Sequence, residues 1–167
     1  LLLTTEWEGP PPALESVVAV AERDGCDLSP IDIRDGAART RLQSFVWPDQ
    51  SERLERLRAA LLVASADPPA LLAQSADDWL QARLGESMPG QVCVVFQSIM
   101  WMYVSKAVRA KITTLIHEAG ARATENAPMA WLRLEGSGVK EAELHLQLWP
   151  GDEDRLLARA HYHGDWV

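Results

Sequence analysis

A continuous apolar run constrains the fold of this chain more than any other feature. It extends over residues 92–96 with the sequence VCVVF, follows Pro89-Gly90-Gln91 and stops at the polar residues Gln97 and Ser98. A β-branched run bounded by turn residues is typical of a strand that helices cover on both faces, as in a parallel sheet. We therefore expect Val92 to Gln97 to form a central, parallel and fully buried strand. Gln97 and Ser98 would then lie at its carboxyl end, where open α/β sheets bind ligands.

The composition is that of one soluble domain, and it limits the partners. The chain has 167 residues, 47% of them hydrophobic and 24% charged, which suffices for one sizeable core. Its formal net charge of -8 would repel phosphate groups, so nucleic acid is not expected as a partner. No apolar stretch reaches the roughly 20 residues of a membrane helix, and a cytoplasmic location is expected. Cys26 and Cys93 are the only cysteines, too few for a disulfide framework or a zinc cluster.

Helical and strand-like segments alternate through the first two thirds of the chain. Apolar residues at helical spacing predict helices over 13–24, from Pro48 to 66, over 76–84 and from the capping residue Ser105 to Gly120. A short strand or an extended crest is expected over 26–33, and a short strand over 70–74. This rhythm of strands and helices predicts an α/β fold.

The last third reads as three strands, over 128–135, 143–149 and 155–163. Leucines alternate with polar residues over 143–149, the mark of a half-exposed antiparallel strand, and Pro150-Gly151-Asp152 turns the chain back. We expect 143–149 to pair antiparallel with 155–163. The predicted fold class is α/β, with a mixed sheet that is parallel at its centre and antiparallel at its carboxyl-terminal strands.

Five segments of the chain carry a resemblance to a known family: GCDLSPIDI (25–33), VWPDQSERLERLRAAL (46–61), VVFQSIMWMYV (94–104), TENAPMAWLR (124–133) and HYHGDWV (161–167). They resemble an uncharacterised bacterial family known only as a domain of unknown function. The resemblance covers nearly the whole chain, and members of the family are similar in fold to S-adenosylmethionine-dependent methyltransferases. It therefore implies a Rossmann-like single domain over 1–167, incomplete at its N-terminus, with the glycine-rich cofactor loop upstream of residue 1.

The resemblance also implies a cofactor site. In that fold an acid at the end of the second strand accepts hydrogen bonds from the cofactor ribose, and Asp27 is the matching residue, although Asp-x-Ser-Pro is also ordinary turn chemistry. Asp77 or Asp78 falls where a residue in contact with adenine would lie, although an acid in a first helical turn also interacts with the helix dipole. Gln97 and Ser98 complete the predicted cofactor-binding residues.

S-adenosylmethionine is not expected to bind tightly to this chain alone. Its amino-acid end needs a backbone opened by glycines, and Gly9 is followed by Pro10-Pro11-Pro12, which removes three N–H donors. Whether the intact protein binds the cofactor stays open at this point.

Four more residues are predicted to bind the substrate: Trp101 and Tyr103, which follow the strand over 92–97, and Glu125 and Asn126, which follow a strand presumed to come after Gly120. We expect Trp101 and the Glu125-Asn126 pair to form one cluster with Asp27, Gln97 and Ser98 at one edge of the sheet. The alternative for Glu125-Asn126 is a purely structural role, as a helix or turn cap.

A metal site is not predicted. His161 and His163 would project from one face of a strand, a spacing that metal sites use, but the expected register places Glu143 opposite His161 and His145 opposite Arg159. A solvated edge strand is the alternative. Two functions stay open: a methyltransferase-like enzyme acting on a small molecule, and a ligand-binding or structural α/β module without catalysis. The sequence determines neither the acceptor nor the oligomeric state.

Overall fold

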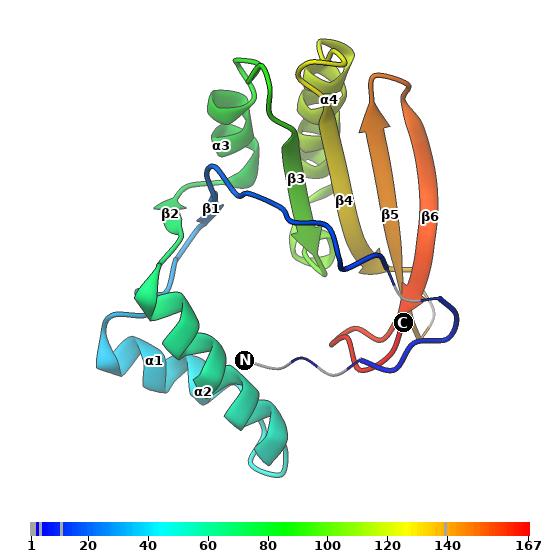
Figure 1. The fold of residues 1–167 in the computed structure, drawn as a ribbon. Helices are drawn as coiled ribbons and strands as arrows, with labels where there is room; N and C mark the ends of the chain where they lie inside the picture. The colour runs from blue at the N-terminus through cyan, green and yellow to red at the C-terminus, as the bar shows by residue number, and fades with distance from the viewer. Residues whose placement is uncertain (1–2, 4, 11, 139) are drawn as a thin grey trace. The chain divides into compact units, whose positions relative to one another are not determined.

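The computed structural model describes residues 3, 5–10, 12–138 and 140–167. The chain folds into two compact units, one built mainly from residues 16–76 and the other mainly from 77–167 together with a short amino-terminal segment. The fold class is mixed α/β, with four α-helices and both parallel and antiparallel strand pairs in the described part. Figure 1 shows the elements of each unit.

The first unit is a parallel strand pair connected through two helices. Strand β1 (Asp24–Asp27) pairs with β2 (Ala70–Ala73), and helices α1 (Gly36–Gln43) and α2 (Ser51–Ala66) lie between them in sequence. The backbone N–H of Gln74 extends the pairing by donating to the carbonyl of Asp27 at 3.1 Å. Helix α2 and strand β2 confirm the predicted elements after Pro48 and over 70–74.

One predicted helix is absent from the described part of the structure, and one helix was not predicted. Residues 13–23 form no helix, because the apolar side chains that should have packed, Leu14, Val17 and Val18, are at least 78% exposed, and a helix without a packed face is marginal in water. Helix α1 was not predicted; it begins where Asp35 accepts hydrogen bonds from the N–H groups of Ala37 and Ala38.

The second unit contains a four-stranded sheet in the order β3-β4-β5-β6. Strands β3 (Cys93–Ser98) and β4 (Met129–Gly136) are parallel, whereas β5 (Ala142–Trp149) and β6 (Glu153–Ala160) continue the sheet antiparallel, as predicted. Helix α3 (Ala76–Arg83) precedes β3, and α4 (Lys106–Ala121), capped by Ser105, connects β3 to β4. At the carboxyl terminus, the N–H of Glu8 donates to the carbonyl of Val167 at 2.7 Å.

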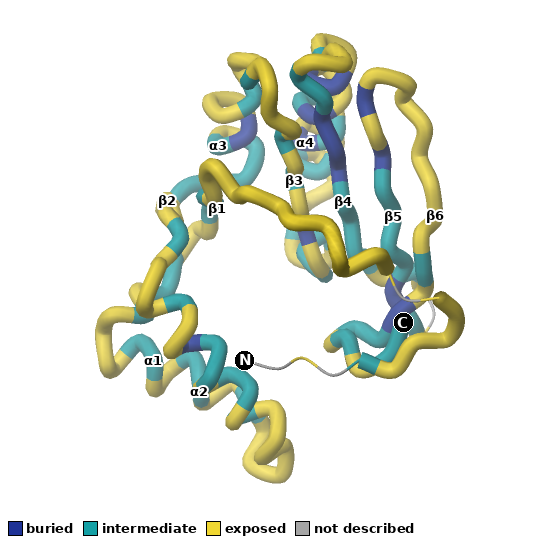
Figure 2. Tube along the Cα trace, viewed as in Figure 1, coloured by how far each residue is buried: buried dark blue, intermediate teal, exposed yellow. Residues whose placement is uncertain are grey.

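Helix α4 packs on one face of this sheet and forms the core with it (Figures 1 and 2). Ile112 and Ile116 on α4 and Trp131 on β4 are at most 1% exposed. The ring of His117 lies edge-on to Trp131 and Trp149, at centroid distances of 6.1 and 5.5 Å. The core therefore lies where α4 crosses the beginning of β4 and the end of β5.

Strand β3 corrects the central expectation from the sequence. It is parallel, but it lies at an edge of the four-stranded sheet, and Val92, Val94 and Phe96 are 55%, 55% and 62% exposed. The reason is the alternation of side chains along a strand: α4 covers the face that carries Gln97 and Trp131, and the even-numbered residues point to the other face. An unbroken apolar run does not reveal whether both of its faces are covered.

Candidate functional site

A strained turn lies at the carboxyl end of β3. Ile99 has a φ of 49°, a left-handed conformation that is costly for a β-branched residue. Its N–H donates to the carbonyl of Leu134 at 2.7 Å, which holds the turn against β4. The chain then forms the short 3-10 helix η1 (Trp101–Tyr103). The turn therefore fixes the point at which Trp101 leaves the sheet.

Glu135, near the end of β4, organises this turn. Its carboxylate accepts hydrogen bonds from the side-chain amide of Gln97 at 2.8 Å and from the backbone N–H groups of Met100 and Trp101 at 3.2 Å. The negative charge thus lies at the amino end of η1, where N–H groups lack partners within the helix. These bonds offset the strain at Ile99 and fix the backbone of Trp101.

Gln97 connects this turn to the core. It is 8% exposed, and both ends of its amide are used: the nitrogen donates to Glu135, and the oxygen accepts from the indole N–H of Trp131 at 3.2 Å. Because the two partners differ in kind, only one orientation of the amide satisfies both. Gln97 is therefore a positioning residue that fixes Glu135.

A network of charged side chains follows on the same face, across β4, β5 and β6. Arg133 donates to Asp154 at 2.6 Å, and its guanidinium lies 4.3 Å from the centre of the Trp131 ring. His145 lies between Glu143 and Asp154, with its ring nitrogens 3.4 Å from an oxygen of each. Burial raises the pKa of Asp154, but the hydrogen bond and charge of Arg133, with the nearby His145, outweigh it, so the pKa is below its ordinary value.

These side chains surround an open pocket of about 210 Å³. Three carboxylates face one guanidinium and one imidazole there, so the pocket has an excess of negative charge when the imidazole is neutral. An aromatic ring forms part of its wall. Such a lining suits a small molecule that carries positive charge or N–H donors. The lining residues include Trp101, Arg133, Glu135, Glu143, His145 and Asp154.

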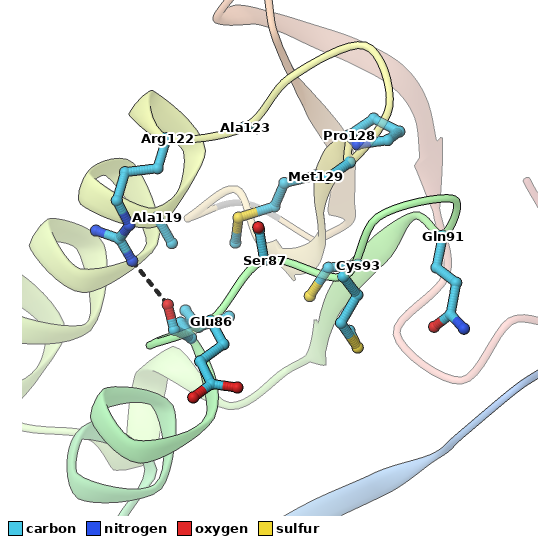
Figure 3. A pocket seen from close by; sticks show the side chains of 12 residues that line it. Glu86, Ser87, Gln91, Cys93, Ala119, Arg122, Ala123, Pro128 and Met129 are labelled. Atoms are coloured by element: carbon cyan, nitrogen blue, oxygen red, sulfur yellow. Dashed lines mark hydrogen bonds between the residues drawn. The ribbon is translucent and has the colours of Figure 1, made fainter.

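A second pocket, at the opposite end of the parallel strands, has a volume of only about 40 Å³ (Figure 3). Cys93, Met129 and Arg122 contribute to its lining, and Arg122 donates to the carbonyl of Leu84 at 2.7 Å. The volume is enough for about one or two ordered waters. We therefore place the candidate site at the larger pocket, and name it the Trp101 pocket.

The structure brings together two of the residues predicted from the sequence. Trp101 lines the pocket, and Gln97 supports it through Glu135. Ser98 follows Gln97 and so points to the opposite face of β3, where it is exposed. Tyr103 is 80% exposed on η1. Neither Ser98 nor Tyr103 lines the Trp101 pocket.

Glu125 and Asn126 lie at the other end of the sheet, which corrects the expected cluster. They precede β4, and the carbonyl of Asn126 accepts from the N–H of Gly90, just ahead of β3, at 2.7 Å. The segment between a helix and the next parallel strand lies at the amino ends of the strands, because the helix returns the chain to the start of the sheet. Both residues lie in a turn, across which Thr124 and Ala127 pair.

The two predicted cofactor acids have local partners. Asp27 is the last residue of β1 in the first unit and accepts a hydrogen bond from the N–H of Ser29 at 2.7 Å. Asp77 lies in the first turn of α3 and forms an ion pair with Lys111 at 2.8 Å. Both contacts match the structural alternatives, a turn cap and an acid at a helix start.

The histidines near the carboxyl terminus are arranged differently from the expectation. Glu143 pairs with Arg159, and His145 pairs with Leu156, because a bulge shifts the register between β5 and β6. His161 and His163 lie beyond β6, and His161 is 2.8 Å from Asp165. Among the described residues, no group of three or more histidine, cysteine or acidic side chains is arranged to hold a metal ion.

Glu135, Arg133 and Asp154 were not singled out from the sequence, and His145 was considered only as a metal ligand. A signal for three of them was present: Trp131, Arg133 and Glu135 alternate along one strand, as do Glu143, His145 and Gln147 along the next. Pairing these strands antiparallel places both polar sets on one face, with Arg133 opposite His145.

Comparison with known proteins identifies a family and no closer relative. A family described as uncharacterized proteins conserved in bacteria (DUF2332) matches residues 1–167, and the chain belongs to this family. No curated protein and no solved structure matches the chain. No helix in the described part has the length and apolar character required to cross a membrane.

Proposed function

We propose that this chain is the substrate-binding part of a methyltransferase-like enzyme, and that the Trp101 pocket holds a small methyl acceptor. The observation that carries the proposal is the position of the pocket at the carboxyl ends of two parallel strands joined by a helix. Ligands of α/β sheets bind at that edge. Trp101 and Glu135 reach the pocket directly from the ends of β3 and β4.

The side chains of the pocket would bind and align the acceptor. Trp101 offers an apolar wall, the carboxylate of Glu135 offers an acceptor for N–H or O–H groups, and His145 can take the proton that the acceptor loses. S-adenosylmethionine, bound by the intact protein, would supply the methyl group. Alignment and exclusion of water would account for most of the rate.

Asp27 is the residue of this chain proposed to hold the cofactor, through hydrogen bonds from the ribose hydroxyls. It is exposed at the carboxyl end of β1, and the hydrogen bond that it accepts from the N–H of Ser29 uses one of its two carboxylate oxygens. The residues around Gly9 do not fit the amino-acid end of the cofactor, because proline follows at positions 10 and 12 and offers no N–H. Tight binding is therefore proposed only for the intact protein.

A ligand-binding module without catalysis is the second candidate. One observation favours it: the ionic side chains of the pocket are largely engaged with one another, Arg133 with Asp154 and His145 with Glu143. A paired network of this kind suits binding without requiring a reaction.

Calorimetry and radiolabelled methyl transfer separate the two candidates. The intact protein that contains residues 1–167 should bind S-adenosylmethionine, and Asp27→Ala should weaken binding at least about tenfold, the loss of one charge-assisted hydrogen-bonded contact. Asp49→Ala, an exposed acid in the same unit, is the matched control. Binding that is unchanged by Asp27→Ala, or micromolar binding by residues 1–167 alone, would contradict the cofactor assignment.

A further inference from the structure

We propose that the Trp101 pocket recognises an organic cation, a small molecule that carries a primary or methylated ammonium group. The proposal rests on the proposed function for the choice of pocket, but not on methyl transfer itself. It is based on two carboxylates, those of Glu135 and Glu143, whose negative charge the nearby arginines do not balance, and on Trp101 beside them.

Glu135 and Glu143 stand directly opposite each other in the antiparallel pair of β4 and β5. Like charges at directly opposed positions of a sheet repel and are destabilising. Glu143 has the guanidinium of Arg159 at 3.7 Å and the ring of His145 at 3.4 Å. In the part of the chain that the structure describes, the hydrogen bonds of Glu135 come from a neutral amide and two backbone N–H groups.

The neighbouring arginine does not neutralise this pair. The guanidinium of Arg133 is engaged by Asp154 at 2.6 Å and lies over the Trp131 ring. The other nearby guanidinium, that of Arg159, is shared between Glu141 at 3.3 Å and Glu143. A cation from outside the chain would therefore relieve the repulsion between Glu135 and Glu143.

Trp101 adds an aromatic wall to the same pocket. Its ring packs edge-on against Trp131, with centroids 6.3 Å apart, and its backbone is fixed by Glu135. An ammonium group that enters between Glu135 and Trp101 would meet a carboxylate and an indole ring together. Both attract a cation, and methylated ammonium groups are bound by aromatic side chains in this way.

The volume restricts the ligand to a small molecule. About 210 Å³ accommodates a group of the size of choline, below the roughly 300 Å³ at which pockets for drug-sized molecules begin. The pocket is open to solvent, so the binding of its charged ligand should also be sensitive to salt.

The test uses two probes of almost equal shape, choline and its uncharged analogue 3,3-dimethylbutan-1-ol. Calorimetry of each with residues 1–167 should show saturable binding of choline that is at least about fivefold tighter than binding of the alcohol, and only choline should weaken as salt is raised. Glu135→Gln should weaken choline at least about fivefold, whereas Glu118→Gln on the exposed face of α4 should leave it unchanged.

A second variant serves as a control for misfolding, because Glu135 also holds the turn after β3. Glu143→Gln leaves the hydrogen bonds of that turn intact and should also weaken choline. Equal affinity for the two probes, no binding of choline, or unchanged binding in both variants would overturn the proposal. Selective binding of choline by a protein that does not transfer methyl groups would instead overturn only the proposed reaction.

Discussion

Replacement of Glu135 by alanine tests how the turn after β3 is held. The substitution removes the carboxylate that accepts from Gln97 at 2.8 Å and from the N–H groups of Met100 and Trp101 at 3.2 Å. A hydrogen bond to a charged group contributes about 1.5–3 kcal/mol net, and part of this loss is recovered because water can reach a half-buried site. We expect the free energy of unfolding to fall by about 2–4 kcal/mol.

Glu135→Gln should cost less, about 1 kcal/mol, because the amide oxygen keeps one acceptor while the charge is lost. Urea unfolding gives both free energies, and amide hydrogen exchange should show faster exchange at Met100 and Trp101 in the alanine variant. Glu118→Ala is the control on exposed helix surface. A cost below about 0.5 kcal/mol for Glu135→Ala, with unchanged exchange at Met100 and Trp101, would refute the role given to the carboxylate.

Three further perturbations follow from the packing and the charges. Gly120→Ala would place a methyl group 2.4 Å from the Trp149 ring, so thermal denaturation should show a loss of about 1–3 kcal/mol despite the better helix propensity of alanine. Phe96→Thr should lower the free energy of unfolding in urea by less than about 1 kcal/mol, because the side chain is 62% exposed. A loss as large as that of a buried core residue would instead indicate that β3 is buried on both faces. Because the pKa of Asp154 is lowered in the folded protein, its carboxylate stabilises the fold above the ordinary aspartate pKa, and this stabilisation is lost as pH falls through the lowered pKa. Asp154→Asn should therefore flatten the acid side of a plot of unfolding free energy against pH. An unchanged acid side would contradict the link to Arg133.

The elements that could be predicted from the sequence are those that bury a single face, because that face sets the spacing of their apolar residues. Helix α4 has its apolar stripe at helical spacing and Ser105 at its start, and strand β5 alternates residue by residue. Both patterns report the local period directly. The burial of β3 could not be predicted in this way, because an apolar run does not say which elements cover it.

The candidate site was predicted only in part, because it also depends on contacts between segments that are separate in the sequence. Gln97 and Trp101 were found because Gln97 lies at the end of a predicted strand and Trp101 follows it. Glu135 and Arg133 were missed because their importance depends on the register of β4 with β5, a contact between separate segments. Glu125 was misplaced because the direction of the chain after α4 decides at which end of the sheet a loop lies.

Nuclear magnetic resonance of the nitrogen-15-labelled chain during a choline titration tests the central claim most directly. If the Trp101 pocket is the ligand site, the indole N–H signal of Trp101 and the amide signals of Glu135 and Gly136 should shift together and saturate. Shifts confined to the small pocket around Arg122, or no saturable shift at Trp101, would contradict the account.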